Sequence, residues 1–189
     1  HIWHVATNFV RMVVLDLTRA RFVIPARFDQ TARYFQKLSW MSAKFAFFAD
    51  VAMIIFGGGL KLKERITARF GDILSWMYMG TSVLRRFEAE GRKKEDLPYM
   101  KWALEYALMR IQQGFEEVTS SLGLLTKGPI SFLMRVNRLG KKPSDKLIYA
   151  LANLAQSPGA HRDRITSGMF ISKDPSHQGN ILDQCLQLS

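Results

Sequence analysis

One long stretch of the sequence, residues 62–90, repeats its apolar side chains at the period of an α-helix. Successive members lie three or four residues apart, a spacing that only a helix places on one face. Gly57, Gly58 and Gly59 precede the stretch as a helix break, and Gly91 follows it as a left-handed C-terminal cap. The pattern predicts one long helix that needs partners of comparable length. The stripe consists of Leu62, Ile66, Phe70, Ile73, Met77, Gly80, Leu84 and Phe87.

A second segment, residues 97–122, carries a stripe of similar length. Asp96, just before it, is a good N-cap residue. A connection of about six residues between the two stripes predicts that the two helices are antiparallel neighbours. The second stripe consists of Met100, Leu104, Ala107, Leu108, Ile111, Phe115, Val118 and Leu122.

Residues 33–56 form a third segment, apolar on nearly every side from Leu38 to Phe56. Such a segment is either a buried core helix or a membrane span. Lys44 and Asp50 lie inside it, and each costs about 2.5–3.5 kcal/mol at the centre of a bilayer. We therefore expect a fully buried core helix.

The N-terminal part predicts one more amphipathic helix, over residues 3–21. Pro25 interrupts it, because proline cannot continue a helix without loss of a hydrogen bond. The connector that follows carries three arginines, which could lie against an acidic partner. These are Arg19, Arg21 and Arg27.

The C-terminal part predicts shorter elements. Residues 144–156 form a helix capped by Ser144 or Asp145. Residues 158–180 are rich in turn residues and predict an ordered loop on the bundle, with Asn180 as the cap of a last helical turn.

Together these elements predict an all-α protein, an up-and-down helical bundle with an extra N-terminal helix. The sequence shows no alternating strand pattern. We divide the chain into residues 1–30, the N-terminal helix with its connector, and residues 31–189, the bundle with its C-terminal loop. The bundle helices are 33–56, 62–90, 97–122 and the shorter 144–156.

The net charge of the chain bears on which partners it could bind. The chain of 189 residues has 27 Lys and Arg against 16 Asp and Glu, a net charge of +11. Because the excess is dispersed, a solvated, mildly basic surface is the first interpretation; acidic lipid headgroups, a polyphosphate ligand or nucleic acid are the alternatives. We rank nucleic acid last and expect no such partner.

The densest basic segment is residues 127–146, with six cations against the single acid Asp145. A short helix over 129–138 would be basic on one face and apolar elsewhere, as in helices that lie at a bilayer interface. The alternative is a solvated basic face packed by its apolar side. The membrane or phosphate contacts would be Arg135, Arg138, Lys141 and Lys142.

Motifs for catalysis or metal binding are missing from the sequence. The triple glycine lacks the spacing and the Ser or Thr of a P-loop. The histidines have no third ligand nearby, so we expect no metal site. Met77 and Met79 could line an acyl groove, although such a pattern is more often plain core. Cys185 is the only cysteine, so no intrachain disulfide exists.

Four stretches of the sequence resemble a known family. GGGLKLKERITARFGDILSWMYMGTSVLRRFEAEG and EDLPYMKWALEYAL, with FAFFADVAMIIFGG before them and SPGAHRDRITSGMFI near the end, resemble the C-terminal domain of the long bacterial acyl-CoA dehydrogenases of fatty-acid β-oxidation, the FadE type. The likeness covers most of residues 31–172.

The resemblance implies an enzyme that oxidises acyl-CoA to trans-2-enoyl-CoA: a glutamate takes the α-proton, FAD takes the β-hydrogen as hydride, and an electron-transferring flavoprotein receives the electrons. The chain opens with HIWHVATNFV, in the middle of an element, so we expect a piece that continues from an upstream flavoprotein core. FAD and the base would belong to that core, and we assign no catalytic or cofactor-binding residue to this chain.

The resemblance also sets expectations for the chain's own role, which would be to pack, dimerise or dock. Related eukaryotic enzymes attach to membranes by a C-terminal helical extension, so we expect a cytoplasmic protein, peripheral at the inner face of the bacterial membrane. A stand-alone module that binds anionic membranes is the alternative. The matched loop would supply a phosphate or partner contact through His161, Arg162, Asp163 and Arg164.

Overall fold

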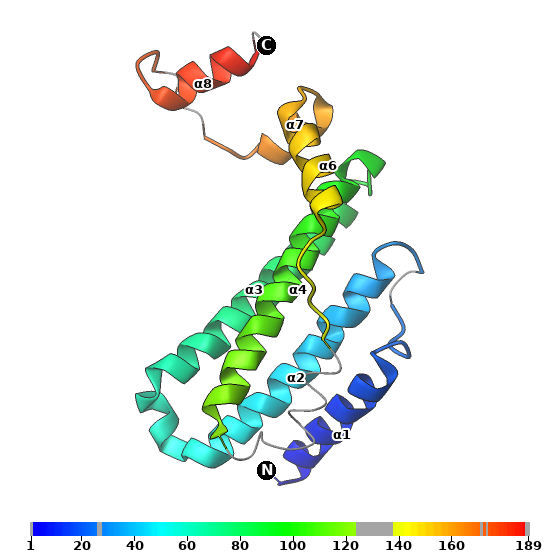
Figure 1. Ribbon diagram of the computed structural model, residues 1–189, viewed down its shortest axis with the longest axis vertical. Helices are drawn as coiled ribbons and strands as arrows, with labels where there is room; N and C mark the ends of the chain where they lie inside the picture. Colours follow the sequence, from blue (N-terminus) through cyan, green and yellow to red (C-terminus); the bar gives the residue numbers. More distant parts are fainter. Residues whose placement is uncertain (1, 26–27, 124–137, 171, 173, 188–189) are drawn as a thin grey trace.

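The computed structural model describes residues 2–25, 28–123, 138–170, 172 and 174–187, and every regular element among them is a helix (Figure 1). The all-α bundle with an extra N-terminal helix is therefore confirmed. The α-helices are α1 (Ile2–Thr18), α2 (Ala32–Phe56), α3 (Glu64–Ala89), α4 (Leu97–Ser121), α6 (Asp145–Gln156), α7 (Ala160–Thr166) and α8 (Gln178–Gln187). Two 3-10 turns, η1 (Gly57–Leu62) and η2 (Lys94–Asp96), precede α3 and α4.

The two long helices α3 and α4 run side by side along the molecule and make its most extensive helix contact (Figure 1). The predicted stripe on α4 is buried along its whole length, from Met100 to Leu122. Gly114 of α4 lets the two backbones approach, because a Cβ there would lie 2.5 Å from Cγ1 of Ile73 on α3. The antiparallel pair expected from the two stripes is confirmed.

The start of the first stripe was placed wrongly. α3 begins at Glu64, and Leu62 lies in η1 with 84% of its surface exposed. Three consecutive glycines disfavour an α-helix, so the chain passes through a 3-10 turn before α3, and Leu62 falls out of register. Phe70 and Met77 are only half-buried on the stripe.

The expectation that the 33–56 helix is buried all round is wrong for its last turns, where Met53 and Ile54 of α2 are 53% and 67% exposed. One face of α2 is nevertheless packed, with Trp40, Met41 and Phe48 in the core. α2 with η1, Ala32–Leu62, is the one helical stretch of the described residues that is long and apolar enough to cross a membrane, a test that core helices also pass.

The polar residues inside α2 are paired with α1. Lys44 Nζ lies 2.9 Å from Oδ1 of Asp16, and both side chains are only 1% exposed. Asn8 Nδ2 donates to Asp50 Oδ2 at 2.7 Å. These contacts fix how α1 lies on α2. They also give the buried charges of Lys44 and Asp50 polar partners, which lipid could not supply.

Helix caps follow the sequence at Gly91 and Ser144 but not at Asp96 or Asn180. Gly91 has a φ of +82° after α3, and Ser144 Oγ accepts from the Leu147 amide at 3.3 Å at the start of α6, as predicted. Asp96, expected to cap α4, makes no capping hydrogen bond. Its carboxylate binds Arg164 instead, because the long arginine reaches it from α7.

The segment expected as a loop, residues 158–180, contains helix α7 and the start of α8. α7 lies at the α3–α4 turn, and α8 lies apart from the bundle (Figure 1). α8 begins at Gln178, two residues before the predicted cap Asn180. The division of the chain at residue 30 stays a prediction.

Candidate functional site

The basic segment of the sequence contributes to a pocket that also involves the turn after α1, α2 and α4. Of the four predicted contacts, Arg138, Lys141 and Lys142 line this pocket, whereas Arg135 and the predicted helix over 129–138 lie outside the described residues. The cavity measures about 620 Å³. Its other charged lining residues are Arg19, Arg33, Lys37 and Glu105.

Residues 138–144 cross the bundle as an extended strip that is fixed in place at three points. Leu139 is buried in the core, and Pro143 is buried beside it in sequence. Gly140 lies directly on α4, where a Cβ would come within 2.2 Å of the Leu108 carbonyl oxygen. The strip therefore holds its cations, Arg138, Lys141 and Lys142, at a defined place.

The helices hold the other cations. Arg33 and Lys37 lie one turn apart at the start of α2. Arg33 Nη1 donates to the Arg19 carbonyl at 2.8 Å, which ties the start of α2 to the end of α1. Arg19 and Ala20 have φ angles of 50° and 55°, so α1 ends in a left-handed turn beside the pocket.

The cations of the pocket repel one another. Burial lowers the pKa of Arg33, and neighbouring Arg21 and Arg19 lower it further. Burial also lowers the pKa of Lys37; Arg33 and Lys141 act in the same direction, and Glu105 opposes them. Half-buried cations with too few counter-charges stabilise an anion placed among them.

Glu105 is the one carboxylate of the lining. It accepts a hydrogen bond from Tyr34 Oη at 3.3 Å. Burial, and then the charge of Glu105, raises the pKa of Tyr34 to about 12, so the phenol keeps its proton and remains the donor. Lys37 Nζ lies over the same ring, 5.9 Å from its centroid.

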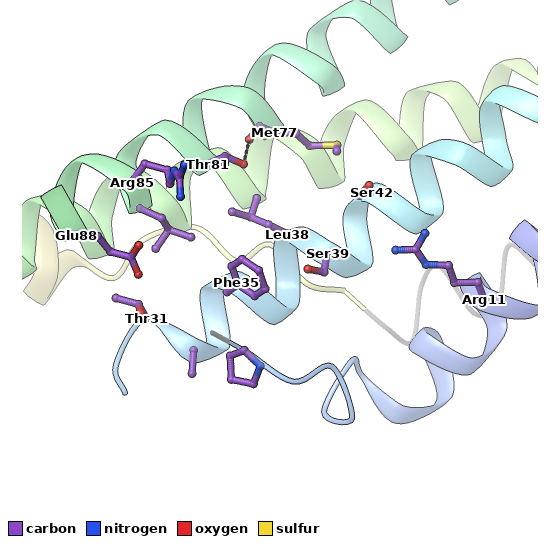
Figure 2. Close-up of a pocket in the computed structure, with 13 residues that line it drawn as sticks. Arg11, Thr31, Phe35, Leu38, Ser39, Ser42, Met77, Thr81, Arg85 and Glu88 are labelled. Atoms are coloured by element: carbon purple, nitrogen blue, oxygen red, sulfur yellow. Dashed lines mark hydrogen bonds between the residues drawn. The ribbon is translucent and has the colours of Figure 1, made fainter. Parts of the chain in front are cut away.

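A second cavity, of about 360 Å³, lies between α1, α2 and α3 (Figure 2). Leu38 and Met77 form part of its apolar wall. Arg85 and Glu88 of α3 lie near one end, and Arg11 of α1 lies at the other (Figure 2). The cleft is suited to a small apolar group with a charged end.

The two methionines of α3 that could line an acyl groove do not line the same cavity. Met77 lines the cleft, but Met79 is 43% exposed and Tyr78 74% exposed. Trp76 packs edge-on against Tyr106 of α4, with 5.4 Å between the ring centroids.

The family motif lies on α7 and joins it to the α3–α4 turn. Arg164 binds Asp96 at 2.9 Å and Glu95 at 3.2 Å. His161 Nε2 lies 2.9 Å from the Leu154 carbonyl oxygen of α6, and Arg162 is half-buried. Asp163 is the one exposed member. The geometry gives Arg164 and His161 structural contacts, and a ligand contact for the four residues stays a prediction.

The sequence does not indicate all the residues of the basic pocket. Arg19 was recognised as a connector arginine, but Arg33 and Lys37 were not singled out. Their i, i+4 spacing at the start of a helix was the available signal, because it places two cations on one face. The spacing does not show which other elements pack against that face.

The resemblance implies FAD, and neither cavity fits it. The cleft is at the low end of the range of about 300–1,000 Å³ for sites of drug-sized ligands, and FAD is larger than such a ligand. The basic pocket is lined mainly by charge, whereas a flavin ring system needs a flat apolar slot. We derive no flavin step on this chain. Among the described residues no three His, Cys, Asp or Glu side chains form a group that could hold a metal ion.

Comparison with known proteins gives one result at the level of the family. No solved structure matches the chain. A family model described as "Acyl-CoA dehydrogenase, C-terminal, bacterial type" matches residues 1–189. The chain therefore belongs to the family of bacterial-type acyl-CoA dehydrogenase C-terminal domains.

Proposed function

We propose that the chain is the non-catalytic helical domain of an enzyme that oxidises acyl-CoA to trans-2-enoyl-CoA with FAD, in the first step of fatty-acid β-oxidation. The observation that carries the proposal is the family match over the whole chain. In this proposal acyl-CoA and an electron-transferring flavoprotein are partners of the whole enzyme, and FAD is held by its flavoprotein part.

The two carboxylates that line the cavities support this division of labour. Glu88, in the cleft, is ion-paired with Arg92 at 2.7 Å. Glu105, in the basic pocket, accepts from Tyr34 and faces six cations. A catalytic base must reach the proton it abstracts within hydrogen-bond distance. Both carboxylates are already engaged in these contacts.

The isolated chain of 189 residues tests the division. We expect no retained flavin absorbance after incubation with FAD and no oxidation of palmitoyl-CoA with an artificial electron acceptor. The whole enzyme in the same assay is the positive control. If the isolated chain held FAD and turned over palmitoyl-CoA, the chemistry would reside here and the proposal would be wrong.

The domain's own work, in this proposal, is to pack against the flavoprotein part through the outer face of α1. Trp3, Val10, Val14 and Leu17 recur at helical spacing on that face, and Trp3 and Leu17 are 85% and 71% exposed. Part of this surface is hollowed into an apolar groove. Contiguous exposed apolar surface of this kind marks an interaction site.

Substitution on α1 tests the packing role. In the whole enzyme, Val10→Glu with Leu17→Glu should make the helical domain easier to remove by limited proteolysis, because two charges would enter the interface. Tyr78→Glu is the matched control, since Tyr78 is equally exposed on α3. Equal proteolysis rates for all three proteins would contradict an interface on α1.

A further inference from the structure

The basic pocket gathers cations from separate parts of the chain around one cavity. Six cations, from the turn after α1, from α2 and from the 138–144 strip, surround one cavity, against the single carboxylate of Glu105. We propose that the pocket binds a soluble ligand that carries a diphosphate group. Coenzyme A belongs to this chemical class, but the inference depends on the pocket alone and not on the proposed function.

The fold holds the cations of the pocket together. The strip cannot move away from α4 without withdrawing Leu139 from the core. Gly140 permits a backbone approach that no other residue allows at that point. Arg33 is fixed by its bond to the Arg19 carbonyl. A cluster of like charges costs free energy, and here the packing of neighbouring residues holds it.

Of the six cations, Arg138 alone has an ion pair among the described residues. Arg138 pairs with Glu116 at 3.2 Å. Among the described residues, Lys141 and Lys142 form no ion pair, and Arg33 donates to neutral oxygens, the Arg19 carbonyl and the Gln36 amide. Phosphate oxygens are the acceptors that arginine and lysine bind most strongly, and arginine can bind them with two parallel hydrogen bonds.

The placing of the cations around the cavity indicates the size of the ligand. The cations come from separate elements that border one cavity, so a ligand with two linked phosphates can contact more of them than a single phosphate can. Arg19, Arg138, Lys141 and Lys142 are exposed, but Arg33 and Lys37 are half-buried within the pocket, where a small polyanion can reach them and a flat bilayer surface cannot. The geometry therefore favours a small soluble polyanion over a membrane.

Titration calorimetry with inorganic pyrophosphate at low ionic strength tests the proposal. We expect saturable binding to the 189-residue chain, tighter than binding of inorganic phosphate and weakened by salt. Lys141→Gln with Lys142→Gln should weaken pyrophosphate binding about tenfold or more, because two charge-assisted contacts are lost. Both lysines are exposed, so the unfolding midpoint without ligand should not change.

Lys61→Gln with Arg65→Gln is the matched control, since it removes the same charge from exposed positions on η1 and α3. We expect this control to bind pyrophosphate within about twofold of the unsubstituted chain, as for a distant, partly screened change of charge. If both double variants weaken binding equally, the effect is the general field of a +11 protein and the proposal fails.

Glu105→Gln gives a test in the opposite direction. Removal of the only carboxylate of the lining should strengthen pyrophosphate binding about fivefold, as expected from the lost repulsion. A structural role alone would not produce tighter binding. Lys37→Gln should weaken pyrophosphate binding, because Lys37 lines the same pocket from α2 rather than from the strip.

Vesicles separate a soluble ligand from a membrane. Flotation with phosphatidylglycerol vesicles that is lost in Lys141→Gln with Lys142→Gln but kept in Lys61→Gln with Arg65→Gln would overturn the proposal. Absence of pyrophosphate binding at any salt concentration would do the same.

Discussion

The buried ion pair between α1 and α2 gives the sharpest test of how this fold is held together. Lys44 and Asp16 are 2.9 Å apart and 1% exposed, and the Trp40 indole nitrogen donates to the same carboxylate. Lys44 Nζ also lies 4.9 Å from the centre of the Trp40 ring. We predict that Lys44→Met strongly destabilises the protein, because it leaves the Asp16 carboxylate buried without its cation.

The magnitude follows from the burial. Burial raises the pKa of Asp16 and lowers that of Lys44, and the attraction within the pair opposes both shifts. Removal of one partner of such a pair costs about 3–5 kcal/mol. For a chain of this size each kcal/mol moves the melting temperature by about 2–4 °C, so a fall of about 6–20 °C is expected.

A double variant separates the pair from simple loss of packing. Asp16→Asn with Lys44→Met removes both charges and leaves an amide oxygen to accept from Trp40. It should recover most of the lost free energy, since replacement of a whole buried pair is often neutral or stabilising. Val13→Ala is the control for loss of packing without loss of charge, because Val13 is half-buried on α1, the helix that carries Asp16.

Urea denaturation followed by tryptophan fluorescence measures all of these variants, and Trp40 lies at the pair itself. The reasoning would be refuted by a loss below about 1 kcal/mol for Lys44→Met, the size of an exposed salt bridge. It would also be refuted if the double variant were less stable than Lys44→Met alone.

Three further predictions follow from individual contacts. Gly140→Ala should cost about 1–3 kcal/mol in urea denaturation, because its methyl group would overlap the Leu108 carbonyl; an unchanged midpoint would contradict the close approach. Arg164→Ala should speed hydrogen exchange in α7, since it removes the ion pair to Asp96, and equal exchange in the two proteins would mean that α7 is held by other contacts. Asp29→Ala should cost about 1 kcal/mol at pH 7 after solvent screening. Hydrogen bonds from Thr31 are the main cause that lowers the pKa of Asp29 below its ordinary value of 3.8. The stability that Asp29 contributes is therefore present above pH 3.8 and is lost as the pH falls through the pKa of the folded protein. If the difference in stability between the two proteins persists undiminished at lower pH, these hydrogen bonds are not its source.

The sequence by itself determined α1, α2, α3, α4 and α6, their order and the pairing of α3 with α4, but not α7 or the start of α8, which lie in a segment expected as a loop. Apolar spacing is a local property, and a side chain every three or four residues can only be buried by a helix with a partner of similar length. The same local rules placed Gly91 and Ser144 at helix ends. They failed at Leu62, where three glycines changed the backbone before the stripe began, and at Asp96, whose carboxylate was taken by a residue 68 positions away.

Tertiary structure alone decided which charges meet. Lys44 and Asp50 counted against a membrane span on the sequence, but only the packing of α1 on α2 supplied Asp16 and Asn8 as their partners. The basic pocket likewise joins Arg33 to a strip more than a hundred residues later in the chain. Electrostatic contacts depend on distance in space, and no periodicity along a chain encodes the distance between elements that the core brings together.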